Sequence, residues 1–142
     1  TNDLQGRGKR VAPMNEAVHR LIGAINARDV EQMAELVAED HVFVDGLGNR
    51  ITGKARVLAA FRHYFRMFPD YTIAVEQAFA DGDASFFMGR ASGTLSRDGV
   101  VAAEDHWNLP AAWLARAKGG VVTEWRVWAD NGYGPLRAIL SR

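Results

Sequence analysis

The sequence of 142 residues contains no cysteine, and this absence excludes several kinds of site at once. Disulfide frameworks, thiolate metal centres and cysteine nucleophiles all need a residue that the chain does not have. The chain also lacks an excess of either charge, because 17 Lys and Arg balance 17 Asp and Glu. Proteins that bind nucleic acids or membrane surfaces usually carry a basic excess, so neither partner is expected.

Long apolar runs and several well-known motifs are missing as well. No stretch approaches the roughly 20 apolar residues of a membrane span, and no signal-peptide pattern opens the chain, so a cytoplasmic location is expected. The sequence shows no P-loop, dinucleotide glycine fingerprint or serine-centred triad motif. Its 4 His do not combine with carboxylates at metal-ligand spacing. We therefore expect neither a metal nor a cofactor.

The chain does contain a helical first part followed by a long series of strand patterns. After a loose polar tail at 1–12, residues 13–142 have the length of a single domain. Helices first and a meander afterwards predict an α+β fold, with about three helices on one face of a curved, mostly antiparallel sheet. Such a sheet forms a cone with a cavity at its mouth. The apolar periodicity predicts helices at 14–28, 30–37 and 54–67, with Thr52 capping the last, and strands at 41–45, 71–80, 84–95, 100–109 and 121–130.

The longest strand patterns lie between residues 100 and 130, on either side of a corner that we expect at Pro110. In the second pattern Trp125 and Val127 share one face, and Arg126 and Trp128 share the other. We expect the first pair to face the cavity. A large aromatic on the outer face suggests that a second subunit covers it.

Asp105 stands out because strand alternation puts it on the same face as Trp107 and Leu109. A carboxylate among apolar neighbours needs a physical reason. One interpretation is an acid whose pKa is raised by the apolar cavity, so that it stays neutral and donates a hydrogen bond. The other is an ion pair with an arginine of a neighbouring strand, such as Arg90 or Arg116.

Asp45 ends a short strand pattern in which His41, Phe43 and Asp45 share one side. A carboxylate at the cavity mouth could act as a general base, provided that it lies close to a carbon beside a carbonyl group. Because Gly46-Leu47-Gly48 follows, it could equally be a turn residue that caps its own loop. His41 could touch the cavity or lie half exposed where the strand begins.

The order helix, helix, strand, helix and long meander resembles the NTF2-like superfamily. Four phrases resemble its SnoaL-like branch: VAEDHVFVDGLG at 37–48, PDY at 69–71, PAAW at 110–113 and EWRVWADN at 124–131. The resemblance covers about 14–130. It implies the conical α+β fold and a habit of forming homodimers. The superfamily includes isomerases, cyclases, epoxide hydrolases, dehydratases and plain binding domains, so the fold alone does not define a reaction.

Two segments are similar to ketosteroid isomerases in particular. The catalytic base of those enzymes falls at Asp45, and their protonated oxyanion-hole aspartate falls at Asp105. Their oxyanion tyrosine on the first helix falls at Leu21, and a supporting tyrosine on the third helix falls at Phe61, with Tyr64 one turn further along. Half of the isomerase oxyanion hole is therefore absent from this sequence.

These patterns lead to one main hypothesis and two alternatives. The main hypothesis is a cofactor-free isomerase, cyclase or hydratase that performs acid–base chemistry on a small apolar molecule, with Asp45 and Asp105 as catalytic residues. The alternatives are a non-catalytic module that binds a small hydrophobic ligand, and a dimerisation scaffold with a filled cone. The expected pocket residues are Leu21, His41, Phe43, Phe61, Tyr64, Trp107, Trp125 and Val127, and the expected interface residues are His106, Arg126 and Trp128.

Overall fold

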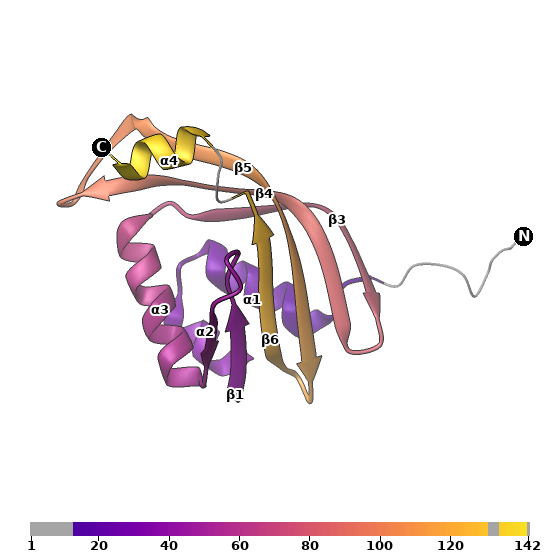
Figure 1. Cartoon of the computed structure of the whole chain (residues 1–142). Coiled ribbons are helices and arrows are strands. Elements are labelled where there is room, and N and C mark those ends of the chain that lie inside the picture. Colours follow the sequence, from indigo (N-terminus) through magenta and orange to yellow (C-terminus); the bar gives the residue numbers. More distant parts are fainter. Residues whose placement is uncertain (1–12, 131–133, 142) are drawn as a thin grey trace, which may run out of the picture.

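The computed structural model describes residues 13–130 and 134–141, and in it helices pack against one face of a curved six-stranded sheet (Figure 1). This is the α+β architecture expected from the sequence; the expected tail at 1–12 lies outside the described residues. The helices are α1 (Glu16–Asn26), α2 (Val30–Leu36), α3 (Lys54–Met67) and α4 (Gly134–Ser141). The strands are β1 (Val37–Val44), β2 (Arg50–Thr52), β3 (Thr72–Asp81), β4 (Ala84–Arg97), β5 (Val100–Lys118) and β6 (Val121–Ala129).

Side-chain caps fix where the first two helices begin. The Asn15 side chain accepts a hydrogen bond from the backbone of Ala17 at the start of α1, and the Asp29 side chain accepts one from the backbone of Gln32 at the start of α2. The third helix differs from the expectation. Thr52 does not cap it, because Thr52 belongs to the short strand β2, and Gly53 takes the cap position without a side-chain bond.

The sheet has the order β2-β1-β6-β5-β4-β3, so β2 and β3 are its two edges and the cone does not close into a barrel. Among the described strands, only β1 and β6 pair in parallel, and every other pair is antiparallel. Figure 1 shows β3, β4 and β5 bending over the helices. A β-bulge opposite Gly89, where the register shifts between Val75 and Gln77, contributes to this bend.

The expected corner at Pro110 is wrong, because β5 runs without interruption from Val100 to Lys118. Pro110 pairs with Arg90 of β4, and the pairing of β5 with β6 begins at the next residue, Ala111. A proline cannot donate a backbone hydrogen bond, so it fits in a strand where one neighbour is missing. Pro110 lies at such a position.

The core fills the space between the helices and the concave face of the sheet. The helix α1 contacts β3, β5 and β6, and α3 contacts β1, β2 and β4. Val18 and Ile25 of α1 are completely buried, and burying a side chain of this size stabilises the fold by about 1.5–3 kcal/mol. The C-terminal helix α4 contacts β5 and buries Ile139. Within the described residues, no helix has the length and apolar character needed to cross a membrane.

Candidate functional site

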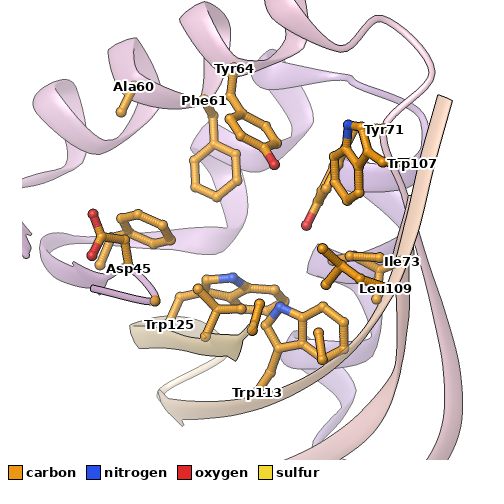
Figure 2. A pocket seen from close by; sticks show the side chains of 16 residues that line it. Asp45, Ala60, Phe61, Tyr64, Tyr71, Ile73, Trp107, Leu109, Trp113 and Trp125 are labelled. Atoms are coloured by element: carbon orange, nitrogen blue, oxygen red, sulfur yellow. The ribbon is translucent and has the colours of Figure 1, made fainter. Parts of the chain in front are cut away.

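A cavity of about 300 Å³ opens between α3 and the concave face of the sheet (Figure 2). Pockets for small molecules run from about 300 to about 1,000 Å³, so this one fits a ligand of one or two rings. In the described part of the chain, its wall is almost entirely aromatic and aliphatic and contains no Lys or Arg. The lining residues are Phe43, Asp45, Gly46, Ala60, Phe61, Tyr64, Tyr71, Ile73, Ala91, Trp107, Leu109, Ala111, Trp113, Trp125, Val127 and Ala129.

Strand alternation explains how one wall of the cavity forms. Successive side chains of a strand point to opposite faces, so every second residue of β5 and β6 can reach the same space. Trp113 at the bottom of the cavity is held by Phe87, whose ring stacks on it at 5.2 Å and 11°. The residues that alternate into the cavity are Trp107, Leu109, Ala111 and Trp113 of β5, and Trp125, Val127 and Ala129 of β6.

The opposite wall comes from α3 and from the segment that follows it. Phe61 packs edge-on against Phe43 of β1, with ring centroids 5.5 Å apart. One turn later along α3, Tyr64 packs edge-on against Tyr71, with centroids 4.9 Å apart and an angle of 85° between the rings. The expected pocket residues Phe43, Phe61 and Tyr64 therefore surround the same space as the sheet residues.

Asp45 lies at the rim of the cavity, directly after β1, and its carboxylate is also bound within its own loop. Oδ1 accepts hydrogen bonds from the backbone N–H groups of Leu47 and Asn49, both at 2.9 Å. Oδ2 accepts one bond, from Asn49 Nδ2 at 3.2 Å, which leaves acceptor capacity on that oxygen. Asp45 therefore holds its own turn and also lines the cavity, while its role as a general base stays a prediction.

Asp105 requires a correction. Its side chain is buried and faces the interior, but it is not among the residues that line the cavity. Arg97 donates to both of its oxygens, from Nε at 3.0 Å and Nη2 at 3.3 Å. This hydrogen bond is the main cause that raises the pKa of Arg97. A guanidinium at this distance stabilises the ionised carboxylate, so the geometry contradicts a neutral acid. The ion-pair interpretation is correct, but its partner is Arg97 and not Arg90 or Arg116.

Two further expected pocket residues lie elsewhere. The His41 side chain is buried and donates from Nδ1 to the carbonyl oxygen of Val122 at 2.7 Å. Burial lowers its pKa, and the bond to Val122 opposes this effect only in part. The register between β1 and β6 shifts between Val37 and Val42, so simple alternation does not carry His41 to the cavity side. Leu21 is buried in the core on α1.

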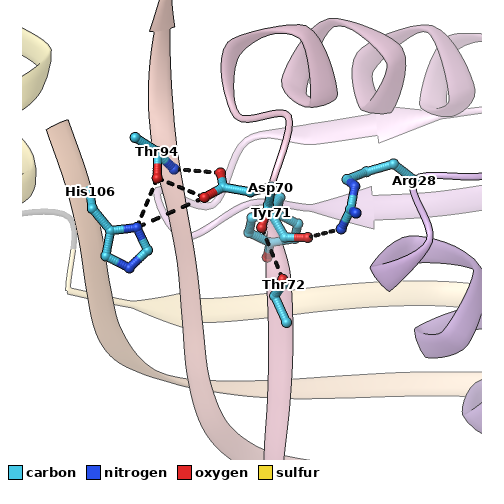
Figure 3. Close-up of polar contacts among 6 residues, drawn as sticks. All are labelled: Arg28, Asp70, Tyr71, Thr72, Thr94 and His106. Atoms are coloured by element: carbon cyan, nitrogen blue, oxygen red, sulfur yellow. Dashed lines mark hydrogen bonds and ion pairs between the residues drawn. The ribbon is translucent and has the colours of Figure 1, made fainter. Parts of the chain in front are cut away.

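Tyr71 is the main lining residue that the expectations from sequence missed. Its backbone position is fixed by polar contacts on both sides (Figure 3). Asp70 accepts bonds from the backbone N–H and the hydroxyl of Thr94, both at 2.7 Å, and Arg28 Nη1 donates to the Tyr71 carbonyl at 2.9 Å. Burial alone would raise the pKa of Asp70, but the bonds from Thr94 outweigh it and the pKa is lowered. His106 Nδ1, on the outer face, lies 2.8 Å from the Thr94 hydroxyl.

The outer face of the sheet carries exposed apolar side chains. Trp128 is 49% exposed and Met88 is 47% exposed. The pairing of Trp128 with Ala112, and of Ala112 with Met88, aligns these three residues across β6, β5 and β4. The guanidinium of Arg126 lies 5.3 Å from the centre of the Trp128 ring, a cation–π arrangement.

The family of the chain follows from comparison with known proteins. A family model described as the SnoaL-like domain matches residues 18–128. The chain belongs to the SnoaL-like domain family. No curated protein matches it. In the described part of the chain, no group of three or more His, Asp or Glu could hold a metal ion.

Solved structures with low sequence identity share the fold. A proposed SnoaL-like polyketide cyclase from Jannaschia sp. CCS1 is 21% identical, with 96% of this chain and 95% of that chain covered and a TM-score of 0.73. IdmH from Streptomyces antibioticus, a proposed polyketide cyclase, is 23% identical, with coverage of 89% and 97% and a TM-score of 0.71. A Catenulispora acidiphila protein with a ketosteroid isomerase-like fold, in complex with trimethylamine, is 19% identical, with coverage of 81% and 85% and a TM-score of 0.69.

Proposed function

We propose that this SnoaL-like protein binds a small, flat and largely apolar molecule in its aromatic cavity and acts on it by cofactor-free acid–base chemistry, with Asp45 as the base. One observation carries the proposal: Asp45 is the single carboxylate among the described residues that line an otherwise apolar cavity. Oδ1 is held by two backbone N–H groups, which fixes the orientation of the carboxylate. Oδ2 retains acceptor capacity for a substrate proton.

The simplest reaction of this kind is an isomerisation. The base takes a proton from the carbon beside a carbonyl group, which leaves an enolate, and then returns the proton to a different carbon. No atom is gained or lost, and no oxidant or reductant is needed. The same first step would begin a cyclisation in which the enolate carbon attacks a second carbonyl of the same molecule.

The test compares wild type with Asp45→Asn on a small β,γ-unsaturated ketone, whose conjugation can be followed by ultraviolet absorbance. Removing a positioned general base lowers a rate by about 10²–10⁴-fold, so we expect a loss in that range. Asp29→Asn is the matched control, because Asp29 also accepts a backbone hydrogen bond in a local cap but does not line the cavity. If Asp45→Asn turns over the ketone as fast as wild type does, Asp45 is only a turn residue.

Non-catalytic binding is the second candidate, and a specific observation favours it. The Asp45 carboxylate already accepts three hydrogen bonds from its own loop, and Asp105 is held in an ion pair with Arg97. A protein that binds ligands in the cavity but converts none of a broad panel of ketones would fit this candidate. The volume of the cavity counts against the third alternative, a scaffold with a filled cone.

We also infer that the chain forms a homodimer through the outer face of the sheet. Beside the row of Trp128, Ala112 and Met88, Phe79 of β3 pairs with Phe86 of β4, two residues from Met88 on the same face. Phe79 is 41% exposed, and its ring stacks on that of Phe86 with centroids 5.2 Å apart. Exposed apolar patches of this kind usually mark an interface. Sedimentation at micromolar concentration should show a dimer, and Trp128→Glu should shift it toward monomer. A wild type that stays monomeric as its concentration rises contradicts the inference.

The expected interface residues are not equally placed for such a dimer. Arg126 contacts Trp128 directly and belongs to the same patch. His106 lies on the outer face as well, but six residues from Ala112 along β5, which corresponds to roughly 20 Å. Replacing His106 should therefore disturb the dimer less than replacing Trp128.

A further inference from the structure

Two phenol hydroxyl groups face the cavity from different parts of the chain. Tyr64 lies near the C-terminal end of α3, and Tyr71 immediately precedes β3. The centroids of their rings lie 4.9 Å apart, and the angle between the ring planes is 85°. Figure 2 shows that the hydroxyl oxygens of Tyr64 and Tyr71 both point into the same open space. A single atom of a ligand placed there could approach both hydroxyls.

Neither hydroxyl has a hydrogen-bond partner within residues 13–130 and 134–141. Tyr71 is only 8% exposed, and buried polar groups in native proteins are normally satisfied. Burial raises the pKa of both phenols, so both remain neutral and able to donate. The buried Trp107 Nε1 also lacks a partner in the described structure, but that atom is sealed from solvent, whereas the phenols reach the cavity.

The chain holds Tyr71 in place without using its hydroxyl. Asn26 Oδ1 accepts a bond from the backbone N–H of Ile73 at 2.8 Å, and Asn26 Nδ2 donates to the Ile73 carbonyl at 3.0 Å. Together with the contacts of Asp70 and Arg28, this fixes the backbone on both sides of the Tyr71 ring. A donor that is positioned in advance loses little entropy when it binds an acceptor. The arrangement is typical of a binding subsite.

We propose that Tyr64 and Tyr71 form a two-donor subsite for one oxygen of the ligand, and that the ligand is a flat, enolisable ketone. This assignment rests on the function proposed above and names its substrate class. Among the described residues, the cavity wall contains no Lys or Arg to balance a charge confined to one small group, such as a carboxylate or a phosphate. Two neutral donors suit a carbonyl oxygen, which carries only a partial charge before reaction.

The two ends of the cavity then have complementary roles. Asp45 lies at the rim, while Tyr64 and Tyr71 lie on the far side of the Phe61 ring from it (Figure 2). When Asp45 removes the proton beside the carbonyl group, the electron pair moves onto the oxygen, and the two hydroxyls donate to that oxygen while keeping their own protons. Asp45 then returns its proton to another carbon of the ligand, so that atoms and electrons balance.

Pentafluorophenol and pentafluorotoluene provide a matched pair of probes. The phenol ionises readily, and its negative charge, which the fluorinated ring delocalises, stands in for the charge that develops on the enolate oxygen, while the toluene has the same ring and no oxygen. Calorimetric titration at pH 7.5 should show tighter binding of the phenol to wild type. Tyr64→Phe and Tyr71→Phe should each weaken phenol binding by about 10- to 100-fold and leave toluene binding unchanged, since one charge-assisted hydrogen bond is lost. Thr123→Val, which removes a hydroxyl outside the cavity, should change neither.

The possible outcomes separate this subsite from the function on which it rests. If both phenylalanine variants bind the phenol as tightly as wild type, the hydroxyls bind only water in the cavity, and the subsite is refuted. Binding of the toluene would in that case still support the proposal that the cavity takes a small apolar molecule. If neither probe binds wild type, both proposals fail. A measurement on wild type alone guards against unfolded variants: bound pentafluorophenol should stay ionised at a lower pH than the free compound, and an unchanged titration refutes the subsite.

Discussion

Replacing Tyr71 with phenylalanine should leave the ligand-free protein as stable as wild type or slightly more stable. Tyr71 is 8% exposed, and its hydroxyl makes no hydrogen bond to the described part of the chain, although its ring packs against Tyr64 and Trp107. A buried donor without an acceptor destabilises a fold by about 1–3 kcal/mol, and water in the cavity offsets part of this. We therefore expect the free energy of unfolding to stay unchanged or to rise by as much as about 1 kcal/mol. Phenylalanine keeps the ring contacts.

Urea denaturation and thermal melting of the ligand-free protein would measure this effect. A gain of 1 kcal/mol corresponds to about 2–4 °C in Tm for a domain near this size. Tyr64→Phe should behave in the same way, and because the two rings touch, the double variant need not show the sum of the single effects. A loss of more than about 1 kcal/mol in Tyr71→Phe would show that its hydroxyl makes a structural bond. The hydroxyl would then not be reserved for a ligand, and the two-donor subsite would lose its basis.

Two further predictions concern the fold. Burial lowers the pKa of His41 below its usual 6.5, so between the two pKa values the unfolded chain takes up a proton that the folded chain does not. The free energy of unfolding should therefore be highest above about pH 6.5 and decline as the pH falls toward the pKa of the folded state. Urea denaturation at pH 7.5 and 5.5 should show this decline, and His41→Asn should flatten it; an equal slope in both proteins would contradict it. Gly89→Ala should destabilise by about 1–3 kcal/mol, because its Cβ would lie 1.9 Å from the Ala74 carbonyl oxygen and the backbone must move. A circular dichroism melt checks this, and a Tm within a degree or two of wild type would contradict it.

Elements with a strong local pattern could be predicted from the sequence. The helix expected at 54–67 has those bounds in the structure, because its apolar spacing and the proline after its end mark it clearly. Alternation also placed Trp125 and Val127 on the concave face. The strand β2 was missed, because three residues are too few for alternation to be recognised. The corner expected at Pro110 was wrong because a strand can continue through a proline where no neighbouring strand needs its backbone N–H, and the sequence does not show where that is.

The candidate site was harder to predict because it depends on register and curvature. The partner of Asp105 is Arg97, eight residues earlier across a tight hairpin, and only the pairing register distinguishes it from the arginines of other strands. The bulge in β1 that turns His41 away from the cavity leaves no mark in local composition. Tyr71 lies just before a strand, so its direction depends on how Asp70 binds Thr94 across the sheet. These contacts join residues far apart in the chain.

The central claim is that the cavity binds a flat ketone and that Asp45 exchanges its proton. The most direct measurement is the exchange of deuterium from D₂O into 2-tetralone, a flat ketone with acidic protons beside its carbonyl group, followed by NMR. We expect wild type and Asp29→Asn to accelerate the exchange and Asp45→Asn to be slower by about 10²–10⁴-fold. If wild type binds 2-tetralone but exchanges its protons no faster than buffer does, or if Asp45→Asn exchanges them as fast as wild type, the claim is contradicted.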